Sequence, residues 1–124
     1  MPHKGKLRYH LVWCPKYRRP VLDGAVGERA KELIYEKAEA NGYKVQELEI
    51  MPDHVQLFVE APATESVHRI VNQFKGFLSR TLREEYPHLK KRLPSLWTRS
   101  YYAGSVGQMS EATVRKYIQQ QRRS

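Results

Sequence analysis

The stretch Met51-Pro-Asp-His-Val-Gln-Leu-Phe-Val-Glu60 decides the fold, because it predicts a tight turn that feeds a strand with two different faces. Side chains alternate across a strand, so one face carries His54, Gln56 and Phe58. The other face is apolar and is expected in the core; it consists of Val55, Leu57 and Val59. An imidazole and a carboxamide then lie side by side, where they could hold a divalent cation through one nitrogen and one oxygen. The alternative is that both only hydrogen-bond to solvent or to a neighbouring strand.

Strands are predicted on both sides of this stretch. Residues 43–50 alternate and lead directly into the turn, so the two segments are expected to pair as an antiparallel hairpin. Residues 7–14 also alternate and predict the first strand, which gives the single cysteine, Cys14, a structural position. Residues 97–103 predict the fourth strand, ended by Gly104.

Helices are predicted where apolar residues recur at spacings of three and four. This pattern covers residues 23–41 and residues 64–83. The basic stretch 86–94 follows as a surface loop. Residues 110–122 form the last predicted helix, capped by Ser110, and its stripe consists of Val114, Tyr117, Ile118 and Gln121.

The order strand, helix, strand, strand, helix, strand predicts an α+β fold of the ferredoxin-like split β-α-β type, with two helices on one face of a four-stranded antiparallel sheet. Strands one and three are central in this topology, so the polar side of the third strand lies in the middle of the uncovered face. The last helix is an addition, and we expect its apolar side on the open face of its own chain or of a partner. It would bring Tyr117 and Gln121 to His54 and Gln56. The chain, residues 1–124, is predicted to be one domain, because its length suffices for a single core.

The charge balance indicates a polyanionic partner. Lysine and arginine number 22 against 13 aspartates and glutamates, which gives a formal net charge of +9. Nucleic acid is the polyanion most typical of such a balance. An anionic membrane is the competing partner, but no predicted helix combines a strong apolar face with a lysine-rich face and aromatic anchors. The chain also lacks an apolar run near the roughly 18 residues of a membrane span, or a signal-peptide core, so we expect a cytoplasmic protein without a membrane partner.

Two segments supply candidate DNA contacts. The loop Pro15-Lys-Tyr-Arg-Arg-Pro20 holds three cations and an aromatic ring, and guanidinium groups bind phosphates while rings stack on bases. The candidates in this loop are Lys16, Tyr17, Arg18 and Arg19. The second helix carries cations opposite its apolar stripe, and the candidates there are Lys75, Arg80 and Arg83. For both segments the alternative is an ordinary solvated, charged surface.

A tyrosine beside a metal site on a basic protein suggests attack of a phenolate on a phosphodiester. The metal would polarise a non-bridging phosphate oxygen. Tyr117 would form a covalent phosphotyrosine, which keeps the energy of the broken bond for rejoining.

Four segments, in order and over nearly the whole chain, resemble the HUH-type single-tyrosine transposases of bacterial and archaeal insertion sequences, the TnpA family. The matching segments are Tyr9-His-Leu-Val-Trp-Cys-Pro-Lys-Tyr-Arg-Arg-Pro-Val-Leu22, Met51-Pro-Asp-His-Val-Gln-Leu57, Leu96-Trp-Thr-Arg-Ser-Tyr-Tyr102 and Val114-Arg-Lys-Tyr-Ile-Gln-Gln-Gln121. The resemblance implies a homodimer that cuts and rejoins single-stranded DNA at ends marked by small imperfect hairpins.

The resemblance also implies roles for individual residues. Tyr117 matches the nucleophile, whose attack would leave a 5′-phosphotyrosine and a free 3′-hydroxyl. His54 matches the first metal-binding histidine, and Gln121 matches the polar residue that completes the metal site. Family members often place the tyrosine helix of one subunit against the metal site of the other, so the site is expected to be shared. The sequence leaves open whether the tyrosine acts within its own subunit.

One position departs from the family pattern: Gln56 stands where a second metal-binding histidine is usual. A glutamine oxygen suits Mg²⁺ or Mn²⁺, so we expect activity with an altered metal preference. The alternatives are a decayed or domesticated copy that binds single-stranded nucleic acid without cutting it, and a rolling-circle replication initiator with the same chemistry. The sequence does not give the DNA hairpin, the cleavage site or the physiological metal.

Overall fold

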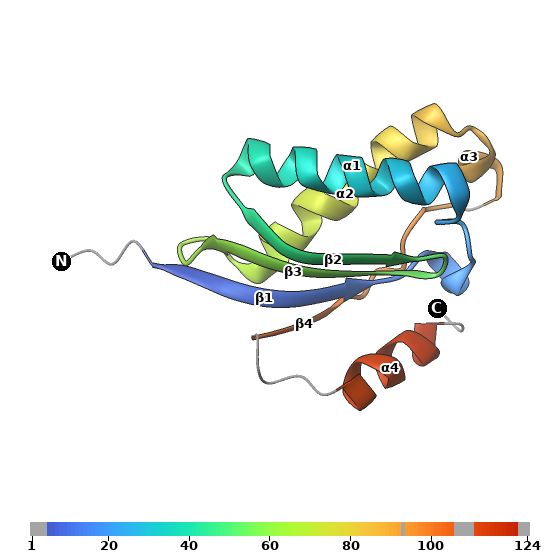
Figure 1. Cartoon of the computed structure of the whole chain (residues 1–124). Coiled ribbons are helices and arrows are strands. Elements are labelled where there is room, and N and C mark those ends of the chain that lie inside the picture. The colour runs from blue at the N-terminus through green and yellow to red at the C-terminus, as the bar shows by residue number, and fades with distance from the viewer. Residues whose placement is uncertain (1–4, 93, 106–110, 122–124) are drawn as a thin grey trace.

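The computed structural model describes residues 5–92, 94–105 and 111–121 (Figure 1). The elements in chain order are β1 (Lys6–Trp13), the 3-10 turn η1 (Lys16–Arg18), α1 (Gly24–Asn41), β2 (Lys44–Met51), β3 (His54–Pro62), α2 (Val67–Glu85), α3 (His88–Arg92), β4 (Tyr102–Ser105) and α4 (Glu111–Gln120).

The four strands form one antiparallel sheet in the order β2-β3-β1-β4. The central strands are therefore β3 and β1, as predicted. Helices α1 and α2 cover one face of the sheet, and α4 lies on the opposite face (Figure 1). This arrangement confirms the ferredoxin-like α+β fold with an extra helix on the open face.

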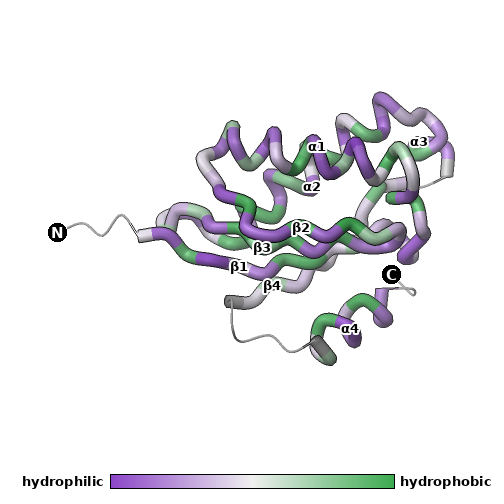
Figure 2. Tube along the Cα trace, viewed as in Figure 1, coloured by the Kyte–Doolittle hydropathy of each residue, from purple (hydrophilic) through white to green (hydrophobic). Residues whose placement is uncertain are grey.

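The hairpin of β2 and β3 forms as predicted, because Pro52 and Asp53 make the turn and Met51 pairs with His54. Hydrophobic and hydrophilic residues alternate along these strands (Figure 2). The apolar side of β3 is fully buried in the core and consists of Val55, Leu57 and Val59. Its polar side faces away from α1 and α2, so the hairpin places a row of polar groups on the open face.

The two long helices begin and end at the residues that their local chemistry favours. Asp23 accepts a hydrogen bond from the first amide of α1 at 3.0 Å, and Gly42 ends that helix with a positive φ of 74°. Ser66 Oγ accepts from Arg69 N at 3.1 Å and caps α2. Among residues 5–92, 94–105 and 111–121, no helix is long and apolar enough to cross a bilayer.

Two sequence predictions for the second half of the chain are wrong. The stretch 86–94 is not only a surface loop, because it contains α3, which buries Leu89 in the core. The fourth strand is shorter and later than 97–103, and Gly104 lies inside it, opposite His10. Trp97 explains the shift: it forms an antiparallel bridge with Pro15 and donates from Nε1 to the backbone of α2, so its segment pairs with the chain just after β1, ahead of the strand that joins the sheet. The predicted cap Ser110 lies outside the described residues.

Candidate active site

His54 begins β3 directly after the turn, and a carboxylate fixes its ring. His54 Nδ1 lies 2.8 Å from Asp53 Oδ1, and Asp53 Oδ2 lies 3.0 Å from Arg18 Nε. An imidazole that donates from Nδ1 to a carboxylate presents the lone pair of Nε2 on the other edge of the ring, which is the orientation typical of metal-binding histidines. Sequence analysis missed the role of Asp53, although its position next to His54 could have indicated it.

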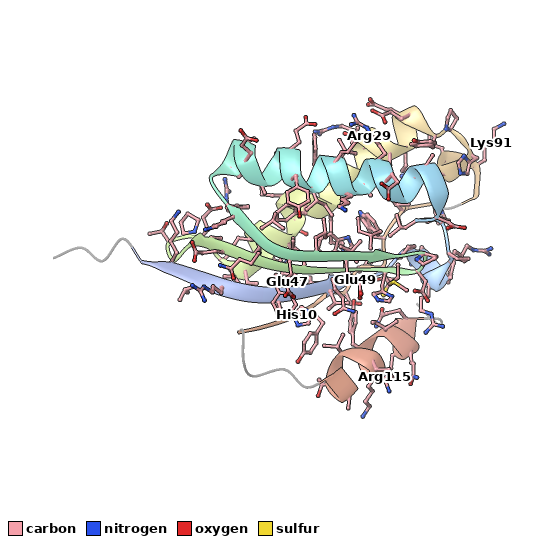
Figure 3. All side chains as sticks on the ribbon, in the orientation of Figure 1. His10, Arg29, Glu47, Glu49, Lys91 and Arg115 are labelled. Carbon is pink, nitrogen blue, oxygen red and sulfur yellow. The ribbon has the colours of Figure 1, made fainter. Side chains whose placement is uncertain are left out.

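Gln56 follows His54 on the same face of β3 and sits between three polar side chains. Its Oε1 lies 3.2 Å from His10 Nε2, while its Nε2 donates to Glu49 Oε1 at 3.2 Å and lies 3.4 Å from His54 Nε2. Figure 3 shows His10 and Glu49 on the side of the sheet that faces α4. In this arrangement the amide nitrogen, not the oxygen, points to His54.

Two side chains would have to rearrange before amide oxygens faced His54 Nε2, because Gln56 Oε1 faces His10 and Gln121 Oε1 faces Ser100. Among the side chains that the structure describes, no three of histidine, cysteine, aspartate and glutamate gather into a metal site, so a cation held at His54 would need glutamine oxygens. A half-turn of the Gln56 amide would bring Oε1 toward His54 Nε2 and the NH₂ group toward His10. Burial lowers the pKa of His10, against the opposing effects of the Gln56 hydrogen bond and Glu47. A neutral His10 can accept from the turned amide, but the turn removes the hydrogen bond to Glu49 and brings the amide oxygen toward that carboxylate, so the turned state needs a positive charge beside these oxygens.

Tyr117 lies on α4, and its hydroxyl group is hydrogen-bonded to a serine side chain. Tyr117 Oη is 3.1 Å from Ser100 Oγ, and its ring centroid is 6.0 Å from that of Tyr102 on β4. Burial raises the pKa of Tyr117 to about 12, and the hydrogen bond to Ser100 opposes part of this effect. The phenol is therefore protonated near neutral pH, and a reaction at Oη requires that the proton be lost.

Gln121 follows α4 directly and shares the same serine. Its Nε2 donates to Tyr117 O at 3.0 Å, which turns Oε1 toward Ser100 Oγ, the donor of a 2.9 Å hydrogen bond. While the Ser100 hydrogen is used in this way, the protonated Tyr117 is the donor in its bond with Ser100, and Ser100 lowers the pKa of Tyr117 only when its hydrogen turns to the phenolate. Sequence analysis missed Ser100, which lies 17 and 21 positions from these partners, a separation without a recognisable spacing.

The structure thus brings the predicted site residues together as two pairs. His54 and Gln56 form one pair on β3, and Tyr117 and Gln121 form the other on α4. Arg18 connects the two pairs, because its guanidinium contacts Asp53 and also donates from Nη1 to Ile118 O on α4 at 3.4 Å.

The predicted DNA contacts divide into surface and internal side chains. Lys75 is only 8% exposed, and its Nζ donates to Thr98 O at 2.8 Å and to Ser100 O at 3.2 Å. Its predicted place on the solvated face of α2 is therefore wrong: the ammonium reaches backbone carbonyls of the segment before β4. Arg18 is likewise turned inward, with a side chain that is 13% exposed.

The other candidate contacts keep a place at the surface. Tyr17 and Arg19 are exposed, and Lys16 Nζ lies 5.3 Å from the centroid of the Tyr17 ring. Arg80 and Arg83 line a surface groove next to α3, in the helical layer. That layer is on the other side of the sheet from Gln56, so among the candidates at the surface those in the loop after β1 are close to the candidate site (Figure 1).

Comparison with known proteins gives a consistent result. A family model described as IS200-like transposase matches residues 3–121. The ISDra2 transposase TnpA of Deinococcus radiodurans is 38% identical over 118 residues, which cover 94% of this chain and 84% of the relative. The transposase of insertion sequence element IS200 from Salmonella typhimurium is 31% identical over 116 residues, which cover 92% of this chain and 76% of the relative.

Two solved structures extend the similarity to three dimensions. A crystal structure of a candidate transposase from Deinococcus radiodurans superposes with a TM-score of 0.89 at 34% identity, and the match covers 98% of this chain and 95% of that one. A REP-associated tyrosine transposase bound to a REP hairpin superposes with a TM-score of 0.60 at 11% identity, covering 95% of this chain and 66% of that one. The second likeness concerns the fold alone.

Proposed function

The chain belongs to the IS200-like transposase family and is a DNA transposase, and from this premise we propose that it cuts and rejoins single-stranded DNA at the hairpin-marked ends of an insertion sequence. The proposed reaction uses a divalent cation and a 5′-phosphotyrosine. One observation carries the proposal: the two halves of the required chemistry lie on one face of the sheet, the histidine and glutamine of β3 and the tyrosine and glutamine of α4.

Tyr117 is the proposed nucleophile. Its Oη attacks the phosphorus, the bond from phosphorus to the 3′ oxygen breaks, and the 3′ oxygen takes up a proton as the phenol loses one. Attack by a 3′-hydroxyl on the phosphotyrosine then restores a phosphodiester and frees Tyr117. One phosphodiester is exchanged for another of similar energy at each step, so rejoining needs no nucleotide hydrolysis.

His54, Gln56 and Gln121 are the proposed holders of the cation, which we take to be Mg²⁺ or Mn²⁺ because the set combines one imidazole with two amide oxygens. A cation held there would polarise a non-bridging phosphate oxygen and favour the charge that develops during attack. Asp53 holds His54 Nδ1 and so leaves Nε2 for the cation, and Gln56 would have to turn its amide oxygen toward Nε2. Gln121 moves together with Tyr117, because one helical turn separates them.

The DNA partner is proposed to be a single strand with hairpin ends, contacted near the site by Lys16, Tyr17 and Arg19. Two copies are proposed to form a homodimer, as the family resemblance implies. In the described chain α4 lies on the open face of its own sheet and contacts its own Arg18 and Ser100. Sharing of the site between subunits stays a prediction.

Covalent capture tests the proposal. The protein is mixed with Mn²⁺ or Mg²⁺ and end-labelled single strands from the DNA that flanks its gene, and the products are separated on a denaturing gel. We expect a slower protein band that carries label, and its loss with EDTA and in Tyr117→Phe. Tyr102→Phe is the matched control, because its ring neighbours Tyr117, and this variant should keep the adduct.

An adduct that survives in Tyr117→Phe would exclude Tyr117 as the nucleophile. DNA binding without any adduct, in every metal, would instead support the non-catalytic single-strand binder. The hydrogen bonds that occupy Gln56 favour that second candidate, since they hold the amide oxygen away from His54.

A further inference from the structure

The loop after β1 has an unusual backbone conformation. Tyr17 and Arg18 are consecutive non-glycine residues with positive φ angles of 58° and 53°, a conformation that side chains disfavour. Hydrogen bonds at both ends of the loop hold it: Lys16 N donates to Leu96 O at 2.8 Å, and Leu22 N donates to Pro52 O at 2.9 Å. Strain of this kind persists where the surrounding structure imposes it, and often at functional sites.

The effect of this backbone is to turn neighbouring side chains in opposite directions. Tyr17 is 46% exposed, whereas the guanidinium of Arg18 reaches inward to two elements distant in sequence. Its Nε bonds to Asp53 Oδ2 at 3.0 Å, and Asp53 Oδ1 holds His54 Nδ1 at 2.8 Å. Its Nη1 donates to Ile118 O at 3.4 Å.

The contact with α4 lies at a point where a cation is favoured. Ile118 is in the last turn of α4, where carbonyl groups lack partners within the helix and the helix dipole is negative. Gln121 Nε2 bonds to the preceding carbonyl, that of Tyr117, so side chains satisfy two successive carbonyls at this helix end. Arg18 caps the helix that carries the proposed nucleophile and, with the same planar group, fixes the carboxylate that orients the proposed metal ligand.

We infer that Arg18 is a positioning residue that holds the tyrosine helix and the His54 ring in one fixed relation, and not a DNA phosphate ligand. The inference rests on the proposed function for the roles of Tyr117 and His54. A guanidinium presents several N–H donors in one rigid plane, so it can serve the two acceptors in fixed directions. A lysine ammonium keeps the charge but not that geometry.

Arg18→Lys is the test variant, and Arg19→Lys is the matched control in the same loop, because Arg19 is exposed. The first measurement needs no DNA: hydrogen–deuterium exchange of the peptide covering residues 111–121. We expect exchange there to rise about tenfold in Arg18→Lys, as for loss of a charge-assisted hydrogen bond, and to stay unchanged in Arg19→Lys. Asp53→Asn is a second variant, expected to slow adduct formation in the same way as Arg18→Lys and to add little to it in the double variant.

Measurements of DNA binding distinguish a positioning role of Arg18 from a role as a DNA phosphate ligand. In EDTA, Arg18→Lys should bind a labelled single strand with wild-type affinity and wild-type salt dependence, while its single-turnover rate of adduct formation falls at saturating DNA. Loss of affinity with a shallower salt slope would make Arg18 a phosphate ligand and overturn the inference. Equal exchange of residues 111–121 in the two variants would also overturn it. Failure of the proposed function looks different, because then the wild-type protein itself forms no adduct.

Discussion

Replacing Ser100 by alanine should weaken the alignment of Tyr117 and Gln121 without removing either side chain. Ser100 Oγ donates to Gln121 Oε1 at 2.9 Å and accepts from Tyr117 Oη at 3.1 Å. Gln121 is 6% exposed, so its amide oxygen would lose a partner in a place where water has little access. Removing one hydrogen-bond partner from a buried acceptor costs up to about 1–3 kcal/mol.

The expected effect on catalysis lies at the lower end of that range, because Ser100 is exposed and water can replace its bond to Tyr117. About 1.4 kcal/mol corresponds to a tenfold change in rate. We expect Ser100→Ala to form the covalent adduct about tenfold more slowly in a single turnover at saturating DNA and metal. Ser100→Thr, which keeps the hydroxyl, should recover part of the rate.

The control for this experiment is Ser95→Ala, which removes a hydroxyl from the same segment. Ser95 Oγ donates to Trp97 O at 3.2 Å, so this change leaves the α4 contacts intact and should leave the rate unchanged. An unchanged rate in Ser100→Ala would refute the reasoning. A faster rate would also refute it, and would mean that the serine holds α4 in a resting position that must be left before attack.

Two further predictions concern the buried lysine and the subunit that supplies the tyrosine. Burial lowers the pKa of Lys75 to about 8 from its usual 10.5, so between these pH values unfolding takes up a proton and the free energy of unfolding rises with pH. Chemical denaturation should show a gain of up to about 3 kcal/mol from pH 8 to pH 10.5 in wild type relative to Lys75→Met, and parallel pH curves would contradict the burial of a charged Lys75. Mixing Tyr117→Phe with His54→Ala subunits tests the placement of α4. The contacts of α4 within its own chain favour no adduct in the mixture, whereas an adduct on the His54→Ala chain would demonstrate exchange of α4 between subunits.

Much of the fold could be predicted from the sequence because its signals are local. The hairpin follows from alternation on both sides of the turn at Pro52, and the central place of β3 follows from the order of elements. The fourth strand was misplaced because Trp97 is a good strand residue by composition. Its indole instead packs on α2, and no local pattern records that contact.

The candidate site was predicted in part, for a related reason. His54, Gln56, Tyr117 and Gln121 are visible as polar groups in otherwise apolar positions. The structure places the members of each pair next to each other, and their roles stay predictions. Lys75 was assigned to the surface because helical periodicity treats a cation off the apolar stripe as solvated, and Arg18 because it lies in a loop rich in cations. Both instead satisfy backbone carbonyls of segments 23 to 100 positions away, which only the tertiary fold brings near.

The placement of Tyr117 and Gln121 one turn apart on α4 links the proposed DNA cleavage to the stability of this one helix. A helix of ten residues is marginal by itself, so α4 keeps its shape through its contacts with the rest of the chain. When those contacts open, local melting removes the proposed nucleophile and one proposed metal ligand in a single event. The capacity to nick DNA should therefore follow the thermal melting of this one helix, and a warmed protein should lose cleavage while its sheet remains folded.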